Sequence, residues 1–245
     1  MQALYRKYRP QDWQSIVGQE HVVNVLKNEA EKEKVSHAYL FSGSRGTGKT
    51  SIARIFAKSL GVNPEDIYEI DAASNRGIDD VRSIRDAVHV LPYSSKYKVY
   101  IVDEAHMLTK DAWNAFLKTL EEPPEHVIFI MATTEPHKLP DTVVSRCESF
   151  AFKKPSHLAL VETILKVAKS EGVTIAKNSA SLVATLAEGS FRDALSILQK
   201  AINSSKDKKL SEDEIEEVLN LGATKYMLKA WANPKELVRI IQSLA

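Results

Sequence analysis

Residues 43–50 carry an uninterrupted glycine-rich pattern of the form G-x-x-x-x-G-K-[ST]. The stretch reads Gly43-Ser44-Arg45-Gly46-Thr47-Gly48-Lys49-Thr50 and is followed by Ser51. The apolar character of residues 37–42 predicts a strand before it, and the spacing of residues 51–58 predicts a helix after it. In this context loop amides and a helix N-terminus converge on an anion, with Lys49 reaching the β/γ-phosphates and Thr50 ligating Mg²⁺. A chance match in a glycine-rich turn is the alternative; the flanking elements favour a nucleoside triphosphate site.

Charge and cysteine content limit the classes of protein that this chain can belong to. Lys+Arg (33) and Asp+Glu (32) leave a formal net charge of +1, so any contact with DNA must be local or shared among subunits. Cys147 is the one cysteine, which excludes an intrachain disulfide and a cysteine-rich zinc cluster. The N-terminus lacks the apolar core of a signal peptide, and no apolar run is long enough to span a bilayer. We therefore expect a cytoplasmic protein.

Strand and helix patterns alternate over residues 1–155. The apolar runs that predict further strands lie at 67–70, 99–102, 127–131 and near 150–152. The segments with helical spacing lie at 19–34, 78–88 and 109–122. This alternation predicts an α/β P-loop domain in which a mainly parallel sheet is flanked by helices on both faces. Residues 1–18 are expected to form an extended arm.

After Pro155 the strand patterns stop and helical patterns follow. Helices are predicted to begin at Ser156, Asn178 and about Phe191, which indicates a small all-helical lid domain over residues 156–222. Residues 223–245 are expected to begin a further helical domain that the sequence does not complete.

Polar residues follow two of the predicted buried strands. Asp103 and Glu104 come after residues 99–102, where Asp103 would hold magnesium and Glu104 would orient or deprotonate the attacking water. An acidic loop after a strand is the alternative, but the upstream phosphate loop favours the catalytic interpretation. Thr133 and Thr134 end the next strand, and we expect Thr134 to sense the γ-phosphate. Thr133 is the near alternative, and simple strand termination is the other.

Two arginines are candidates for contact with the triphosphate. Arg146, in a short segment at the domain edge, can stabilise transition-state charge on the ATP of a neighbouring subunit. Arg192 begins a helix of the second domain and can couple nucleotide state to the angle between domains. A solvated arginine and a surface salt bridge are the respective alternatives. Cys147 lacks an activating partner in the sequence and is interpreted as a small buried hydrophobe.

Several longer stretches carry a more specific signal than the phosphate loop. They are Tyr5-Arg6-Lys7-Tyr8-Arg9-Pro10, Val17-Gly18-Gln19-Glu20-His21, His37-Ala38-Tyr39-Leu40-Phe41-Ser42-Gly43, Glu69-Ile70-Asp71-Ala72-Ala73-Ser74, Leu117-Lys118-Thr119-Leu120-Glu121-Glu122-Pro123-Pro124 and Arg192-Asp193-Ala194-Leu195-Ser196. With the phosphate loop, they make nearly the whole chain resemble the AAA+ ATPases and, within them, the bacterial clamp-loader subunits.

The resemblance implies roles for the residues already singled out. It implies an ATP–Mg²⁺ site at the phosphate loop, Lys49, Thr50, Asp103 and Glu104. It also implies that Thr134 is a first sensor, Arg146 a finger acting in trans and Arg192 a second sensor. Val17 and Gly18, with the arm around residues 8–10, would close over the adenine.

The resemblance further implies an ATPase within the hetero-oligomeric DNA polymerase III holoenzyme, whose activity is DNA-directed DNA synthesis. Such a subunit loads the sliding clamp on primed DNA together with other clamp-loader subunits, away from any membrane. Leu91-Pro92-Tyr93 would contact the clamp, and Asn75 and Arg76 the DNA backbone.

Two departures from the family pattern matter. The four-cysteine zinc module usual between the phosphate-loop helix and the next strand is reduced to residues 61–66 without cysteine, so zinc is not expected. The oligomerising collar is represented only by its beginning, so the isolated chain is expected to be monomeric.

Two other functions are compatible with parts of the sequence. A nucleotide-binding scaffold without significant turnover is the main alternative, although Lys49, Thr50 and Glu104 are all kept. The stretch Asp103-Glu104-Ala105-His106 also matches a DEAH-type helicase motif, but the helical region after Pro155 leaves no second ATPase-like domain.

Overall fold

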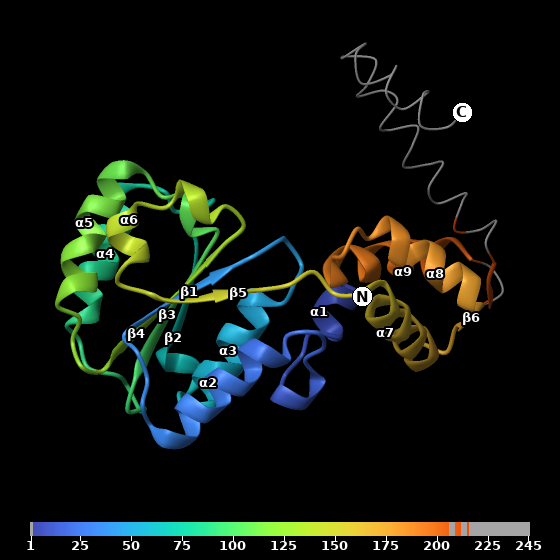
Figure 1. The fold of residues 1–245 in the computed structure, drawn as a ribbon, viewed down its shortest axis with the longest axis horizontal. Coiled ribbons are helices and arrows are strands. Elements are labelled where there is room, and N and C mark those ends of the chain that lie inside the picture. Colours follow the sequence, from blue (N-terminus) through green and yellow to red (C-terminus); the bar gives the residue numbers. More distant parts are fainter. Residues whose placement is uncertain (1, 206–208, 212–214, 216–245) are drawn as a thin grey trace, which may run out of the picture. The chain divides into compact units, whose positions relative to one another are not determined.

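The computed structural model describes residues 2–205, 209–211 and 215 of the 245-residue chain (Figure 1). Its internal contacts divide the chain into two compact units. One unit is Arg9–Pro155, and the other joins the N-terminal residues up to Tyr8 to the residues from Ser156 onward. The expected end of the lid domain at residue 222 and the expected start of a further domain at 223–245 lie outside the described residues.

The α/β unit is built on one five-stranded parallel sheet with the order β2-β3-β4-β1-β5. Its strands are β1 (Ala38–Ser42), β2 (Ile67–Asp71), β3 (Lys98–Asp103), β4 (Val127–Thr133) and β5 (Glu148–Ala151). The register pairs Asp71 with Asp103, and Ser42 with Thr133. The polar residues at the carboxyl ends of these strands therefore share one edge of the sheet.

Helices cover both faces of this sheet, which confirms the predicted α/β class (Figure 1). The helices of the unit are α2 (Glu20–Lys32), α3 (Lys49–Ser59), α4 (Ile78–Val88), α5 (Lys110–Glu121) and the short α6 (Asp141–Val144). Along β1, Tyr39 and Phe41 pack in the core with α2 and α3, while Leu40 packs in the core with α4 and α5. This alternation is the two-residue period of a strand, so each face has its own apolar core.

The second unit is mainly helical. It contains α1 (Leu4–Lys7), α7 (His157–Ser170), α8 (Lys177–Leu186) and α9 (Phe191–Ser204), and its core includes Leu160, Ile164, Val183 and Leu198. Ser156 and Ser190 cap α7 and α9 through their hydroxyl oxygens. Contrary to the prediction that strands stop at Pro155, β6 (Thr174–Ile175) pairs with β7 (Lys209–Leu210). Strands of two residues are too short to show a period in the sequence.

The N-terminal arm is not extended throughout, so that prediction was wrong. Residues Leu4–Lys7 form α1, and residues Trp13–Ser15 form the 3₁₀ helix η1. Leu4 is buried in the helical unit, where its backbone N–H donates to the side chain of Gln199 at 2.9 Å. Lys7 and the Tyr8 hydroxyl both bind Glu171. The arm is therefore shaped by contacts with residues more than 160 positions away.

No helix among residues 2–205, nor in the few described positions after them, combines the length and apolar character that crossing a membrane requires.

Candidate active site

The phosphate loop connects β1 to α3 and depends on glycine at several positions. Gly43, Gly46 and Gly48 have φ of 146°, 74° and 100°. A Cβ at Gly43 would lie 2.6 Å from the carbonyl oxygen of Phe152, so a side chain there requires the backbone to move. Gly48 is the N-cap of α3, and no side chain caps that helix. The first amides of α3 are therefore left for an anion.

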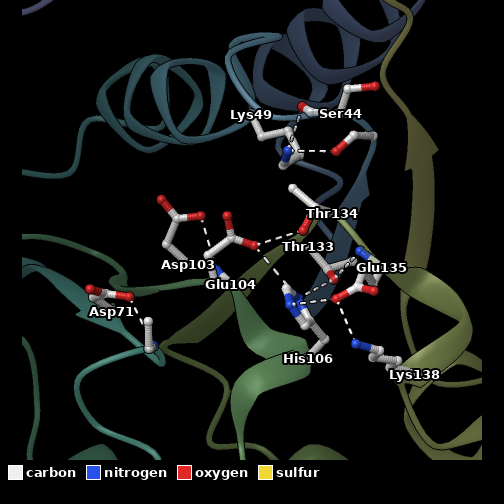
Figure 2. A network of polar contacts seen from close by, with 12 residues as sticks. Ser44, Lys49, Asp71, Asp103, Glu104, His106, Thr133, Thr134, Glu135 and Lys138 are labelled. Carbon is white, nitrogen blue, oxygen red and sulfur yellow. Dashed lines mark hydrogen bonds and ion pairs between the residues drawn. The ribbon is translucent and has the colours of Figure 1, made fainter. Parts of the chain in front are cut away.

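Lys49 points back into the loop that precedes it (Figure 2). Its Nζ donates to the carbonyl oxygens of Gly43 at 2.7 Å and Ser44 at 2.9 Å, and the residue is only 6% exposed. Burial lowers the pKa of Lys49, while Glu104 and Asp103 act in the opposite direction. A buried cation beside a glycine-rich loop is the arrangement that a triphosphate requires.

Thr50 and Asp103 form the oxygen pair that fits magnesium. The Thr50 hydroxyl donates to Asp103 Oδ2 at 2.8 Å, and Asp103 Oδ1 accepts the Glu104 backbone N–H at 3.0 Å. In the described part of the chain, no group of three or more His, Cys, Asp or Glu side chains is arranged to hold a metal ion. Mg²⁺ at a nucleotide site takes one or two protein ligands plus phosphate oxygens, so a hydroxyl and one carboxylate suit it.

Glu104 lies beside Thr134, which directly follows β4 (Figure 2). Its φ of 48° is rare for a residue with a side chain and turns the chain sharply after β3. Its Oε2 accepts the Thr134 hydroxyl at 3.1 Å. Thr133, the other sensor candidate, is fully buried and bonds instead to His106. The geometry therefore places Thr134 rather than Thr133 beside the carboxylate.

His106 also belongs to this site, although it was not predicted from the sequence. Its Nδ1 is 3.0 Å from the Thr133 hydroxyl and 3.5 Å from Glu104 Oε2, and its Nε2 is 3.1 Å from Glu135 Oε2. The sequence signal for it is its place in the Asp103–His106 motif, which also matches a helicase motif.

Gln19 is a second residue near the phosphate loop that was not predicted from the sequence. It is 1% exposed, and its amide donates to the carbonyl oxygens of Lys153 at 2.6 Å and Thr47 at 3.5 Å. Its Oε1 accepts the Lys153 N–H at 3.1 Å. Just before it, Val17 is 41% exposed and Gly18 has φ of 76°. Gln19 thus joins the predicted adenine-binding segment to the phosphate loop.

The other predicted loop residues have varied surroundings. The Thr47 hydroxyl donates to the Ser44 carbonyl at 2.9 Å, which tightens the loop. Ser51 is buried on α3, and Arg45 is exposed. These residues surround the loop without adding a charged group to its interior.

Arg146 lies at the opposite edge of the sheet from the phosphate loop. It comes directly before β5, whose first residue Glu148 pairs with Tyr39 near the start of β1. The phosphate loop follows the far end of β1, and five residues span roughly 16 Å. The guanidinium donates to Glu121 Oε1 at 2.7 Å and to the Thr142 carbonyl at 2.6 Å. Arg146 is therefore not part of the cluster around Lys49.

Arg192 belongs to the other unit. It is the second residue of α9, and its guanidinium carbon lies 5.3 Å from the centroid of the Tyr5 ring. This cation–π contact holds it within the helical unit.

Cys147 is partly buried, and its thiol donates to the Val143 carbonyl at 3.1 Å. Burial raises the pKa of Cys147 to about 12. A thiol that stays protonated at neutral pH is a poor nucleophile, which agrees with its interpretation as a buried apolar residue.

The residues predicted to contact partners are exposed or lie on a loop. Leu91 is 73% exposed and Tyr93 87% exposed, while Asp66 Oδ1 accepts the Tyr93 N–H at 2.6 Å. Asn75 donates to the carbonyl oxygen of Asp71 at the end of β2 at 3.0 Å, and Arg76 donates to that of Ala73 in the loop at 2.7 Å.

Two protein-family models match the chain. The model described as DNA polymerase III, delta subunit, matches residues 18–75 and 61–156. The model described as DNA polymerase III clamp loader subunit, ATPase lid domain, matches residues 159–207. Among solved structures, the Thermotoga maritima RuvB Holliday junction branch migration motor aligns with a TM-score of 0.72 at 22% identity. The alignment covers 87% of this chain and 72% of that one and supports the AAA+ fold.

Curated relatives are more similar in sequence. DNA polymerase III subunit tau of Bacillus subtilis (strain 168) is 48% identical over 87% of this chain, and that of Escherichia coli (strain K12) is 43% identical over 83%. The chain spans 42% and 35% of the lengths of these two relatives. With both family models matched in succession, the chain belongs to the clamp-loader ATPase family of bacterial DNA polymerase III, in the group of its gamma and tau subunits.

Proposed function

We propose that this chain is an ATP-hydrolysing clamp-loader subunit, which uses ATP to load a sliding clamp on primed DNA. The observation that carries the proposal is the convergence of Lys49, Thr50, Asp103, Glu104 and Thr134 at the carboxyl edge of one sheet. Family membership supports the role in replication. The DNA-directed DNA polymerase activity of the complex belongs to other subunits.

The chemistry follows from the positions of these groups. The Lys49 ammonium and the first amides of α3 would bind the phosphates. Thr50 and Asp103 would hold Mg²⁺, which when bound neutralises charge on the phosphate oxygens. The Glu104 carboxylate would orient the attacking water and accept its proton. Thr134 would sense the γ-phosphate through its hydroxyl, which already lies 3.1 Å from Glu104 Oε2.

Residues away from the strand ends would also contact the nucleotide. Val17 and Gly18 would lie against the adenine, and Gln19 would hold that segment to the loop through Thr47. Arg192 would act as the second sensor from the helical lid. Arg192 would leave Tyr5 and contact the phosphate when nucleotide binds. This exchange would couple nucleotide binding to the conformation of the lid.

Arg146 would complete the active site of a neighbouring subunit. The roughly 16 Å length of β1 separates it from the phosphate loop of its own chain, a longer distance than an arginine side chain can reach. Its bond to Glu121 keeps the guanidinium at the edge of the unit, where a neighbour's nucleotide can meet it. Supplied in trans, such an arginine typically accelerates hydrolysis by about 10³–10⁵.

The proposed partners are other clamp-loader subunits, the sliding clamp and primed DNA. Exposed Leu91 and Tyr93 form the apolar surface for the clamp, and the loop with Asn75 and Arg76 would approach the DNA backbone.

The test is the steady-state ATPase of the full-length protein assembled with its partner subunits, with and without clamp and primed DNA. We expect turnover to rise when both are added. An ATPase that ignores clamp and DNA would contradict the loader function, while leaving ATP hydrolysis itself intact.

A further inference from the structure

His106 is the one polar residue of the Asp103–His106 motif to which the proposed function gives no task. It lies on the short 3₁₀ helix η3 (Ala105–Met107), directly after the strand that carries Glu104. Its side chain is 6% exposed. Figure 2 shows the ring between Glu104 on one side and Thr133 and Glu135 on the other. A polar ring this buried requires partners, and its partners suggest its role.

The end of β4 fixes the orientation of the ring. Nδ1 is 3.0 Å from the Thr133 hydroxyl, and Nε2 is 3.1 Å from Glu135 Oε2. The same Thr133 hydroxyl accepts the Glu135 backbone N–H at 3.0 Å. A hydrogen bond from Lys138 lowers the pKa of Glu135, so that carboxylate is ionised and can only accept. Nε2 therefore carries a proton, and the two nitrogens bind the last residue of β4, Thr133, and Glu135 just after it.

The other side of the ring faces the proposed catalytic carboxylate. Nδ1 lies 3.5 Å from Glu104 Oε2, the same oxygen that accepts the Thr134 hydroxyl at 3.1 Å. The ring thus closes one side of the carboxylate while Thr134 binds it. Since the Glu104 backbone is itself turned into the left-handed region at φ of 48°, few carboxylate orientations remain.

We propose that His106, held by Glu135, is a positioning residue that directs the Glu104 carboxylate toward the attacking water. The inference rests on the proposed function, because it assigns Glu104 to that water. Lys138 Nζ binds Glu135 Oε2 at 2.8 Å, so the support extends from the carboxylate through His106 to the 3₁₀ helix η4 (Pro136–Lys138). Loss of the ring leaves the carboxylate free to turn, and a misplacement of about 1 Å can reduce a rate about 10²-fold.

The experiment measures kcat, KM, nucleotide affinity with a fluorescent ATP analogue, and Tm in the full-length assembled protein. For His106→Ala we expect kcat to fall about 10- to 100-fold, while KM, affinity and Tm change little. Glu135→Gln should lower kcat less, because an amide oxygen can still accept from Nε2. Adding Glu135→Gln to His106→Ala should cause little further loss, since both act through one contact.

Two further variants separate positioning from packing. His106→Gln places an amide nitrogen near the position of Nε2 and should recover much of the lost kcat. His137→Ala is the matched control: this histidine is 73% exposed, and its Nε2 is 4.0 Å from Glu135 Oε1. It should leave kcat unchanged.

Three results would overturn the inference. One is an unchanged kcat in His106→Ala. The second is a joint fall of affinity and Tm that His106→Gln does not restore, which would mean a structural role. The third is absence of turnover in the unmodified assembly, which is measured first. That result would refute the proposed function, on which the inference depends.

Discussion

The two edges of the parallel sheet carry the residues that we propose as opposite halves of a phosphoryl-transfer site. Hydrogen bonds order the carboxyl edge. Lys49 binds the phosphate loop, Asp103 binds the Glu104 backbone, and the Glu104 carboxylate binds Thr134. At the amino edge, Arg146 binds Glu121 and borders a surface hollow of about 520 Å³ lined also by residues 36–38. The first edge has a place for phosphate; the second presents Arg146 away from the phosphate loop of its own chain.

Parallel strands explain this division. All carboxyl ends of the sheet meet at one edge, so residues that follow strands converge, whereas a residue that precedes β5 must lie at the other edge. One chain cannot bring both halves together without breaking the sheet. A neighbouring chain can, if its amino edge approaches the carboxyl edge of the first.

The largest expected effect concerns the amino edge. Arg146→Ala in the assembled full-length protein should lower kcat by about 10³–10⁵, because charge on the transferring phosphate loses its stabilising cation. In a verified monomer the same change should leave the slow basal turnover unaltered. Rapid-quench and steady-state ATPase assays measure both. Arg82→Ala, which removes an exposed arginine paired with Asp79, is the control. Equal losses in monomer and assembly would place Arg146 in its own active site.

The next effect concerns the carboxyl edge. Glu104→Gln should lower kcat by about 10²–10⁴, since the amide cannot accept a proton from water, while ATP affinity persists. Single-turnover hydrolysis and nucleotide binding separate the two. Hydrolysis that continues at the unmodified rate would favour a nucleotide-binding scaffold over an ATPase.

A smaller effect is expected when a glycine of the phosphate loop is replaced. Gly43→Ala should weaken nucleotide binding and lower the free energy of unfolding by about 1–3 kcal/mol, because Cβ would meet the Phe152 carbonyl. Gly61→Ala is a matched control: φ is 74°, but no atom lies within 4 Å of the added Cβ. Gly61→Ala should lower the free energy of unfolding by about 1 kcal/mol and leave nucleotide binding unchanged. If Gly61→Ala weakened nucleotide binding as much as Gly43→Ala, the effect at Gly43 would come from strain at positive φ and not from the close approach of Phe152.

The smallest effect is expected beside Arg146. The pKa of Cys147 is raised to about 12, so its thiol should react slowly with iodoacetamide at pH 8. The rate should rise about tenfold per pH unit up to pH 10, because the thiolate fraction does. Cys147→Ala should not change ATPase activity. Fast alkylation at pH 8 would show that the amino edge opens in solution.

Local patterns were sufficient to predict much of the fold. The apolar runs predicted five strands in a mainly parallel sheet, and all of its pairings are parallel. The helix from Ile78 to Val88 has the expected bounds. At the site, the grouping of Lys49, Asp103 and Glu104 could be predicted because residues that come just after parallel strands meet at one edge of the sheet. Their roles in catalysis belong to the proposed function. The choice between Thr133 and Thr134 could only be stated as a preference, since it depends on how β4 ends.

The features that sequence reasoning missed depend on contacts between distant segments. Leu4 becomes part of a helix that binds Gln199, 195 positions away, and no local pattern signals that pairing. Gln19 resembles a surface residue in sequence but is buried because it binds the backbone of Lys153. His106 was visible in a motif, yet its role depends on Glu135, which only the pairing of β3 with β4 brings near.

Mixing two defective variants of the full-length protein tests the division between edges most directly. One carries Glu104→Gln and keeps its arginine; the other carries Arg146→Ala and keeps its carboxylate. Each alone should hydrolyse ATP slowly in its assembly, and the mixed assembly should recover a substantial fraction of the unmodified rate. A mixture that stays as slow as its two parents would contradict an active site shared between neighbouring chains.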